Sequence, residues 1–219
     1  MDTQSTKKNS ISEIIKVYDN KIVKLYCWAR FMILRKRFLD EIGQYLPREG
    51  HVLDIGCGFG LFSLYFAQNL GKLAITGIDI NTDRIDAARM AAQKLNVINV
   101  QYEIGDAISY SLESKYDSIY MLDIVHHIPR EAVRPLLARL HSVLTDKGKL
   151  IIKDVQTKPK YKLLFTWLLD KLMNWRATPH YWEKHELSKT LQNLGFEVYT
   201  HNMNDILPYP HIIYICLKN

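Results

Sequence analysis

Cysteine is scarce in this chain of 219 residues, and its placement excludes two common ways of stabilising a small protein. The three cysteines, Cys27, Cys57 and Cys216, are an odd number, and no two of them have the close spacing of a zinc-binding pair. A disulfide framework and a structural zinc site are therefore not expected, and the thiols are predicted to be reduced packing residues. No metal site is predicted elsewhere, since the histidines and glutamates around 180–186 match no metal-binding spacing.

Long apolar runs are also missing. The longest charge-free stretches, such as 25–29 and 31–34, fall far short of the roughly 20 residues that span a bilayer as a helix. The first ten residues, MDTQSTKKNS, lack the apolar core of a signal peptide. We therefore expect a cytoplasmic protein, with peripheral contact at the inner face of a membrane left open.

Acidic residues are in short supply in two segments of the chain. Residues 1–50 carry ten Lys/Arg against six Asp/Glu, and residues 153–189 carry eight against four, whereas 51–152 carry ten against eleven. Within these basic segments, 21–39 and 158–176 mix cations with aromatic and aliphatic residues, a composition that suits an interfacial helix on anionic lipid. The alternatives are nucleic acid, an anionic ligand, or a helix that packs its apolar stripe on the core and solvates its charged face.

After residue 50, short apolar runs alternate with amphipathic helical patterns. Such alternation is typical of a doubly wound α/β fold with a mostly parallel sheet, and seven strands are expected. The turn region around Pro208 and Pro210 predicts that the last two strands pair in an antiparallel manner. The strands are predicted at 51–55, 73–80, 99–105, 116–122, 148–155, 196–202 and 212–218, and the helices near 60–70, at 82–95 and at about 131–144.

The length fits one compact domain. We divide it into an N-terminal helical cap, a core, a lid-like helical insert after the fifth strand, and a C-terminal helix with the closing strands. The predicted boundaries are 1–48, 49–155, 156–182 and 183–219.

The stretch VLDIGCGFG, residues 52–60, joins the first strand to the first helix of the core. In a doubly wound sheet a ligand binds at the carboxyl ends of the strands, and glycines let the backbone approach it closely. The spacing departs from the dinucleotide pattern G-x-G-x-x-G, because Leu61 stands where the third glycine would fall. The carboxylate of Asp54 would repel a pyrophosphate but suits a ligand with an ammonium or sulfonium group.

VLDIGCGFG is similar to the first motif of the class I S-adenosylmethionine-dependent methyltransferases, whose fold is Rossmann-like. Three further stretches resemble later motifs of that family in order: GIDI (77–80), GDA (105–107) and YDSIYMLDIVHHIP (116–129), while KGKLIIKD (147–154) is similar to the fifth strand region. The resemblance implies that Asp79 binds the ribose hydroxyls, Asp106 the adenine amino group and Asp54 the amino group of the methionine part. The cofactor-binding residues implied in this way are Asp54, Gly56, Cys57, Gly58, Gly60, Asp79, Ile80, Asp106, Ala107 and Leu122.

The fourth motif contains the residues that could act on a methyl acceptor. Asp123 and His127 are four residues apart, so one helical turn would bring them together, and His126 is a neighbouring candidate. This stretch resembles the phosphoethanolamine methyltransferases, which have an Asp-x-x-x-His at the same place and an N-terminal tyrosine that covers the site. The resemblance implies that His127, Asp123 and Tyr18 are the catalytic residues.

The acceptor is not defined by these motifs. The two basic segments favour a small lipophilic or membrane-presented acceptor, methylated on O or N, and the alternative is a soluble molecule such as a phosphobase or a natural-product phenol. A nucleic-acid methyltransferase is less favoured, because Leu122-Asp123-Ile124-Val125 replaces the N/D-P-P-Y/F motif of enzymes that act on base amines. A non-catalytic partner subunit is also less favoured, because the chain keeps the motif glycines and acids.

Overall fold

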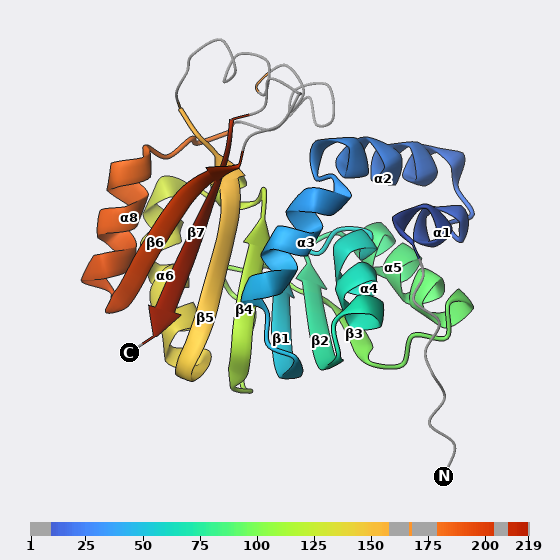
Figure 1. Ribbon diagram of the computed structural model, residues 1–219, viewed down its shortest axis with the longest axis horizontal. Coiled ribbons are helices and arrows are strands. Elements are labelled where there is room, and N and C mark those ends of the chain that lie inside the picture. The colour runs from blue at the N-terminus through green and yellow to red at the C-terminus, as the bar shows by residue number, and fades with distance from the viewer. Residues whose placement is uncertain (1–9, 158–166, 168–178, 204–209, 219) are drawn as a thin grey trace. The chain divides into compact units, whose positions relative to one another are not determined.

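The computed structural model describes residues 10–157, 167, 179–203 and 210–218 of the chain (Figure 1). It divides into two compact units, residues 1–106 and 107–219, which are taken in turn below. The predicted insert at 156–182 and the basic segment 158–176 lie largely outside the described residues. None of the described helices is long and apolar enough to cross a membrane.

Three helices begin the first unit: α1 (Ile11–Lys16), α2 (Lys21–Ile33) and α3 (Lys36–Tyr45). The side chain of Ser10 accepts a hydrogen bond from the Glu13 backbone N–H, and the Glu13 side chain accepts from the Ser10 N–H, so a capping box starts α1. The side chain of Asn20 caps α2 in a similar way by accepting from the backbone N–H of Ile22. The predicted helical cap at 1–48 is therefore helical over its described part.

A parallel three-stranded arrangement follows in the same unit. Strand β1 (Glu49–Ile55) pairs with β2 (Lys72–Asp79), which pairs with β3 (Val100–Ile104). The connecting helices are α4 (Leu61–Asn69) and α5 (Thr82–Lys94); nearly all of α4 is buried, as its apolar sequence LFSLYFA predicts. Asp54 pairs in register with Gly77, so the glycine-rich loop after β1 starts at the same level as the end of β2.

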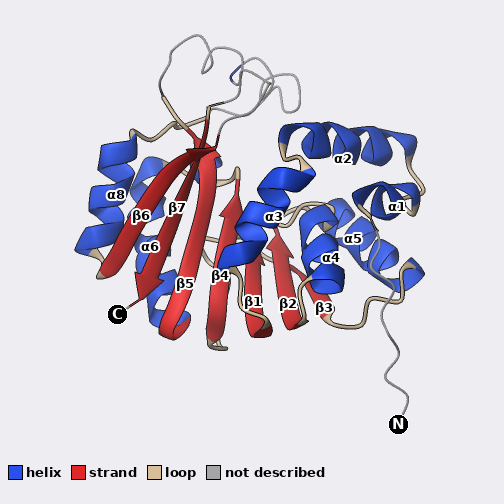
Figure 2. Ribbon diagram, viewed as in Figure 1, coloured by secondary structure: helices blue, strands red, loops and turns tan. Residues whose placement is uncertain are grey.

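The second unit continues with parallel strands and ends with antiparallel ones (Figure 2). Strand β4 runs parallel to β5, while β7 is antiparallel to both β5 and β6. Helix α6 contacts β5 and helix α8 contacts β6. The elements are β4 (Tyr116–Leu122), the 3-10 helix η1 (Val125–His127), α6 (Arg130–Val143), β5 (Leu144–Val155), α8 (Lys184–Asn193), β6 (Phe196–Met203) and β7 (His211–Lys218).

The strand order is β3-β2-β1-β4-β5-β7-β6, and the predicted seven-stranded, mostly parallel sheet with an antiparallel last strand is confirmed. The largest difference in a strand boundary is at β5, which begins at Leu144 instead of the predicted Gly148. Leu144 already pairs with Tyr116, and a register irregularity follows before Ser118 pairs with Lys149; Lys147, in this stretch, has a φ of 64°.

Candidate functional site

The glycine-rich loop of the first unit is fixed by the neighbouring strand. The backbone N–H groups of Gly56 and Cys57 both donate to the carbonyl oxygen of Ile78, at 2.8 and 3.0 Å. The three glycines have φ angles of 74°, 56° and 75° in chain order, a left-handed conformation that side chains disfavour. The conformation of the loop backbone therefore accounts for the glycine spacing, whether or not a ligand is bound.

Only one of two neighbouring glycines in this loop faces open space. A Cβ atom added to Gly58 would meet no atom within 4 Å, whereas one added to Gly60 would lie 2.5 Å from the Tyr102 hydroxyl. Tyr102 is buried beneath the loop, where its hydroxyl donates to the Gly60 carbonyl and bonds the Ser63 hydroxyl. Gly60 is thus required by internal packing, and Gly58 leaves the room that a ligand could use.

Asp79, at the end of β2, ties the loop to the start of α5. One carboxylate oxygen accepts from the Gly58 N–H at 3.0 Å, and the other accepts from the Asn81 N–H at 2.9 Å. A carboxylate has about four lone-pair positions, so these two bonds leave it able to accept further hydrogen bonds, such as those of two hydroxyl groups. Ile80, next in the chain, is largely exposed, and Asp106 is half-buried at the end of the unit.

Two carboxylates act on the glycine-rich loop. The pKa of the Cys57 thiol is raised well above its ordinary value, first by burial and then by the carboxylates of Asp54 and Asp79. Both carboxylates are themselves buried. A thiol that remains protonated in this field is a poor nucleophile, and the same field favours a ligand with positive charge.

The N-terminal helices contact the same loop through aromatic side chains. The hydroxyl of the buried Tyr18 donates to the Phe59 carbonyl at 2.7 Å, and burial raises the pKa of Tyr18 well above its ordinary value, so the phenol stays a donor. The ring of Phe59 packs edge-on against Tyr26 with 5.1 Å between centroids, and the Arg84 guanidinium lies 5.6 Å from both ring centroids. The structure therefore brings the predicted covering residue Tyr18 to the glycine-rich loop.

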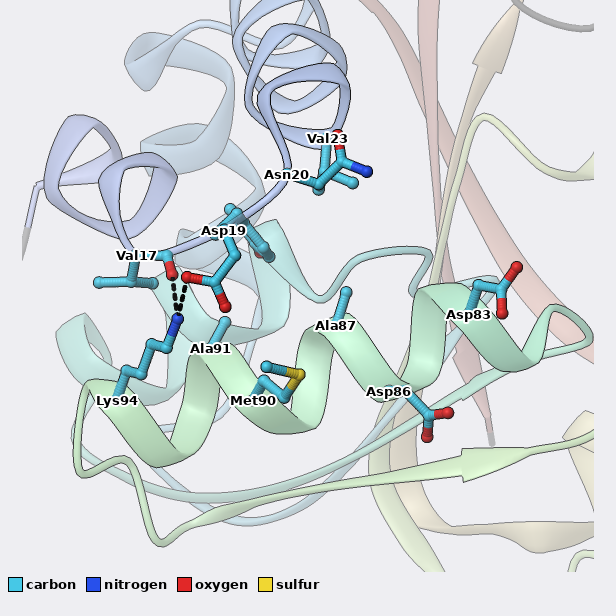
Figure 3. Close-up of a pocket in the computed structure, with 11 residues that line it drawn as sticks. Val17, Asp19, Asn20, Val23, Asp83, Asp86, Ala87, Met90, Ala91 and Lys94 are labelled. Carbon is cyan, nitrogen blue, oxygen red and sulfur yellow. Dashed lines mark hydrogen bonds and ion pairs between the residues drawn. The ribbon is translucent and has the colours of Figure 1, made fainter.

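A pocket of ≈ 230 Å³ lies between the α1–α2 connection and α5 in the first unit (Figure 3). Val23, Ala87 and Met90 contribute to its apolar lining, and the Lys94 ammonium closes one end by an ion pair with Asp19 at 2.5 Å. Tyr18 is one of the residues that line the pocket, whereas no residue of the glycine-rich loop lines it. Nothing in the sequence pattern predicted this pocket.

In the second unit, the residues after β4 form a buried charged cluster with the end of β5. Asp123 has a φ of 57°, its N–H donates to the Lys153 carbonyl at 2.8 Å, and its carboxylate forms an ion pair with the Lys153 ammonium. The Lys153 side chain is completely buried. The sequence pattern predicted a strand at Lys153 but not this ion pair. The pair was not predictable from the pattern because the parallel register of β4 and β5 brings together residues 30 positions apart.

His126, the neighbour of the predicted His127, has a carboxylate partner that the sequence did not predict. His126 is buried, and both its backbone N–H and its ring Nδ1 bond the carboxylate of Asp154. The Tyr181 ring stacks on His126, with 5.6 Å between centroids, and the His180 N–H donates to the His126 carbonyl at 2.6 Å. His127 is exposed beside it, with 4.1 Å between the two rings. The Asp154 partner was missed because sequence spacing detects only neighbours on one helix.

The fold and the loop define a Rossmann-like protein that can hold a nucleotide-like ligand with a cationic part. The comparisons give the family that the chain resembles: residues 52–148 match the family described as "Methyltransferase domain", and this part of the chain is similar to the S-adenosylmethionine-dependent class I methyltransferases. The predicted resemblance is confirmed.

Named relatives match over part of the chain. An (S)-coclaurine N-methyltransferase of Papaver somniferum is 27% identical over 104 residues, which is 48% of this chain and 29% of the relative. Phosphoethanolamine N-methyltransferase 3 of Arabidopsis thaliana is 32% identical over 126 residues, 57% of this chain and 24% of the relative. The chain thus spans less than a third of the length of these two relatives.

Solved structures share the fold over most of the chain. A magnesium protoporphyrin IX methyltransferase from Synechocystis PCC 6803 with bound SAH has a TM-score of 0.68 at 22% identity, and the match covers 93% of this chain and 92% of that one. An S-adenosylmethionine-dependent methyltransferase from Methanosarcina mazei gives a TM-score of 0.68 at 22% identity, covering 81% and 96%.

The different surroundings of Gly58 and Gly60 predict different outcomes for alanine substitution. Gly60→Ala is expected to lower the free energy of unfolding by about 2–5 kcal/mol, since left-handed strain of roughly 1–2 kcal/mol adds to the clash with Tyr102. Gly58→Ala meets only the strain, so its loss should stay near about 1–2 kcal/mol, with a clear loss of S-adenosylmethionine affinity. Urea unfolding and calorimetric titration of both variants check this. Equal destabilisation would contradict the separate roles.

Proposed function

We propose that this protein is an S-adenosylmethionine-dependent methyltransferase that methylates a small lipophilic acceptor on oxygen or nitrogen. The observation that carries the proposal is the loop at Gly58: its N–H is held by Asp79, the space above it is open, and the surrounding carboxylates favour a cation. A sulfonium nucleoside meets those three conditions, whereas a pyrophosphate ligand does not.

Apart from Ala107 and Leu122, the residues that would bind and orient the cofactor belong to the first unit. Asp79 keeps lone pairs for the ribose hydroxyls after bonding Gly58 and Asn81, and the buried Asp54 would attract the amino group. Asp106 would accept from the adenine amino group, with Ala107 beside it, and Leu122 would line the methionine part. When bound, the cofactor supplies an electrophilic methyl group on its sulfonium. Tyr18 would cover the site through its bond to Phe59.

The residues of the second unit would act on the acceptor. The two bonds from His126 to Asp154 anchor η1, which carries the exposed His127. Asp123, held by Lys153 at the end of β4, would complete the predicted Asp-x-x-x-His pair with His127. Their role would be to align the acceptor and, for an acidic group such as a phenol, to remove its proton.

The class of acceptor follows from the relatives and from the composition. The relatives include N-methyltransferases named for coclaurine and phosphoethanolamine, which are small molecules, and an O-methyltransferase of Penicillium expansum, whose name gives the acceptor atom as oxygen. The basic, aromatic-rich segments favour a lipophilic or membrane-presented acceptor. A soluble phosphobase or phenol is the second candidate, favoured by the relation to the phosphoethanolamine enzyme.

The acceptor class can be tested by product partition. The protein is incubated with methyl-labelled S-adenosylmethionine and a total cell extract, and the label is separated into organic and aqueous phases. Label that appears in the organic phase with the wild type, and is lost when Asp79 is replaced, would support a lipophilic acceptor. Label confined to the aqueous phase would select the soluble acceptor, and no transfer to either phase would contradict the proposed activity.

Replacing His127 with Ala is expected to lower turnover about 100-fold if it removes the acceptor proton, because general-base catalysis typically contributes 10²–10⁴-fold. Affinity for S-adenosylmethionine should be unchanged. His185→Ala removes another exposed histidine, on α8, and serves as the matched control. Turnover of the His127 variant equal to that of the control would remove His127 from the proposed catalytic set.

A further inference from the structure

Helix α2 presents an apolar surface that the described part of the chain leaves uncovered. Ile22 is 76% exposed, Leu25 is 65% exposed and Trp28 is 53% exposed. Because these residues are spaced by three, they lie on one side of the helix, opposite the buried Cys27. Among the described residues, the other large exposed apolar side chains, such as Ile98, do not form such a row on one helix. Single exposed apolar side chains are ordinary, but a contiguous row indicates an interaction surface.

Positive charge accompanies this surface. Lys21 and Lys24 lie on the same helix, and residues 21–39 hold six Lys/Arg and no Asp/Glu. Among these six, Lys36 forms an ion pair with Asp40, and the Arg30 guanidinium lies 5.8 Å from the centre of the Phe62 ring. The two lysines of the first turn of α2 therefore stand beside the apolar row. We name Lys21, Ile22, Lys24, Leu25 and Trp28 the α2 face.

The chemistry of the α2 face fits a lipid surface better than a macromolecule. Tryptophan and lysine both suit the region between headgroups and acyl chains, since each has an apolar body and a polar end. Lysine is depleted in protein–protein interfaces, and exposed isoleucine and leucine contribute little to binding a phosphate backbone. Basic and apolar residues on one exposed helix are the features of an interfacial helix.

We propose that the α2 face docks the protein on the surface of an anionic bilayer. At such a surface the protein would reach a lipophilic methyl acceptor. This biological purpose of the α2 face rests on the proposed function. The α2 face narrows the membrane contact predicted for 21–39 to five residues of one helix. The neighbouring Tyr26 and Cys27 face inward and connect α2 to the glycine-rich loop through Phe59 and Tyr18.

The test is co-sedimentation of the full chain with vesicles of phosphatidylcholine containing 30% phosphatidylglycerol, at low salt. Wild-type protein should bind, and binding should fall as salt rises. Ile22→Ser/Leu25→Ser/Trp28→Ser should weaken binding at least tenfold. Lys21→Gln/Lys24→Gln should weaken it about 30-fold, since each lysine near the surface contributes about fivefold.

Two double variants are the controls: Ile98→Ser/Tyr199→Ser removes exposed apolar groups elsewhere, and Lys184→Gln/Lys189→Gln removes exposed lysines of another helix. Both should bind vesicles as the wild type does.

S-adenosylmethionine affinity of each variant is measured in the same series by calorimetry. Loss of vesicle binding with unchanged cofactor affinity supports the α2 face. Absence of vesicle binding by the wild type, or equal losses in α2-face and control variants, overturns it while leaving the methyltransferase proposal intact. Salt-sensitive binding to a nucleic-acid duplex that depends on the same lysines, without vesicle binding, would also overturn it. Wild-type protein that binds vesicles but not S-adenosylmethionine would instead contradict the proposed function.

Discussion

Replacing Lys153 with Met is expected to lower the free energy of unfolding by about 3–5 kcal/mol, because the substitution leaves the buried Asp123 carboxylate without the Lys153 ammonium. For a chain of this length such a loss corresponds to a fall in Tm of roughly 6–20 °C. Urea unfolding and thermal melting measure it directly. Since native proteins are stable by only about 5–15 kcal/mol, this single change could remove a large part of the total.

The second charge provides the control for this prediction. Asn tolerates the left-handed backbone that Asp123 adopts, so the double variant Lys153→Met/Asp123→Asn removes both charges without new backbone strain. Replacement of both partners of a buried ion pair is often close to neutral, and the double variant should recover most of the lost stability. A single variant within about 1 kcal/mol of the wild type would show that the pair is solvated and contributes little.

Replacing Asp79 with Ala is expected to weaken S-adenosylmethionine binding by about 1.5–3 kcal/mol, or roughly 10- to 150-fold in Kd. The substitution removes the proposed ribose acceptor and also the two bonds that hold the Gly58 and Asn81 N–H groups. Calorimetric titration measures the affinity, and urea unfolding measures how much of the loss comes from a loosened loop.

Two further variants separate these contributions. Asp79→Asn keeps a neutral oxygen that can accept one of the loop hydrogen bonds, so it should retain more stability than the Ala variant while still losing affinity. Asp86→Ala removes an exposed carboxylate of α5 that pairs with Arg89, and should leave the affinity unchanged. Unchanged affinity in both Asp79 variants would refute the assignment of the second motif.

The sequence by itself determined the order and type of the strands and the position of the glycine-rich loop. Apolar runs such as 73–80 and 116–122 are readable because strands buried on both faces must be continuously apolar, and the observed β2 and β4 nearly coincide with them. VLDIGCGFG was equally readable, because left-handed backbone at Gly56, Gly58 and Gly60 strongly favours glycine at those three positions.

Only the tertiary structure decided which side chains are partners. Lys153 and Asp154 meet Asp123 and His126 across the parallel register of β4 and β5, about 30 residues away in sequence, where helical spacing has no predictive value. Likewise, the packing role of Gly60 depends on Tyr102, which lies beneath it and comes from a strand two places along the chain. Local conformation is set by each residue and its near neighbours, whereas buried charge pairs and packing contacts depend on strands that the fold alone brings together.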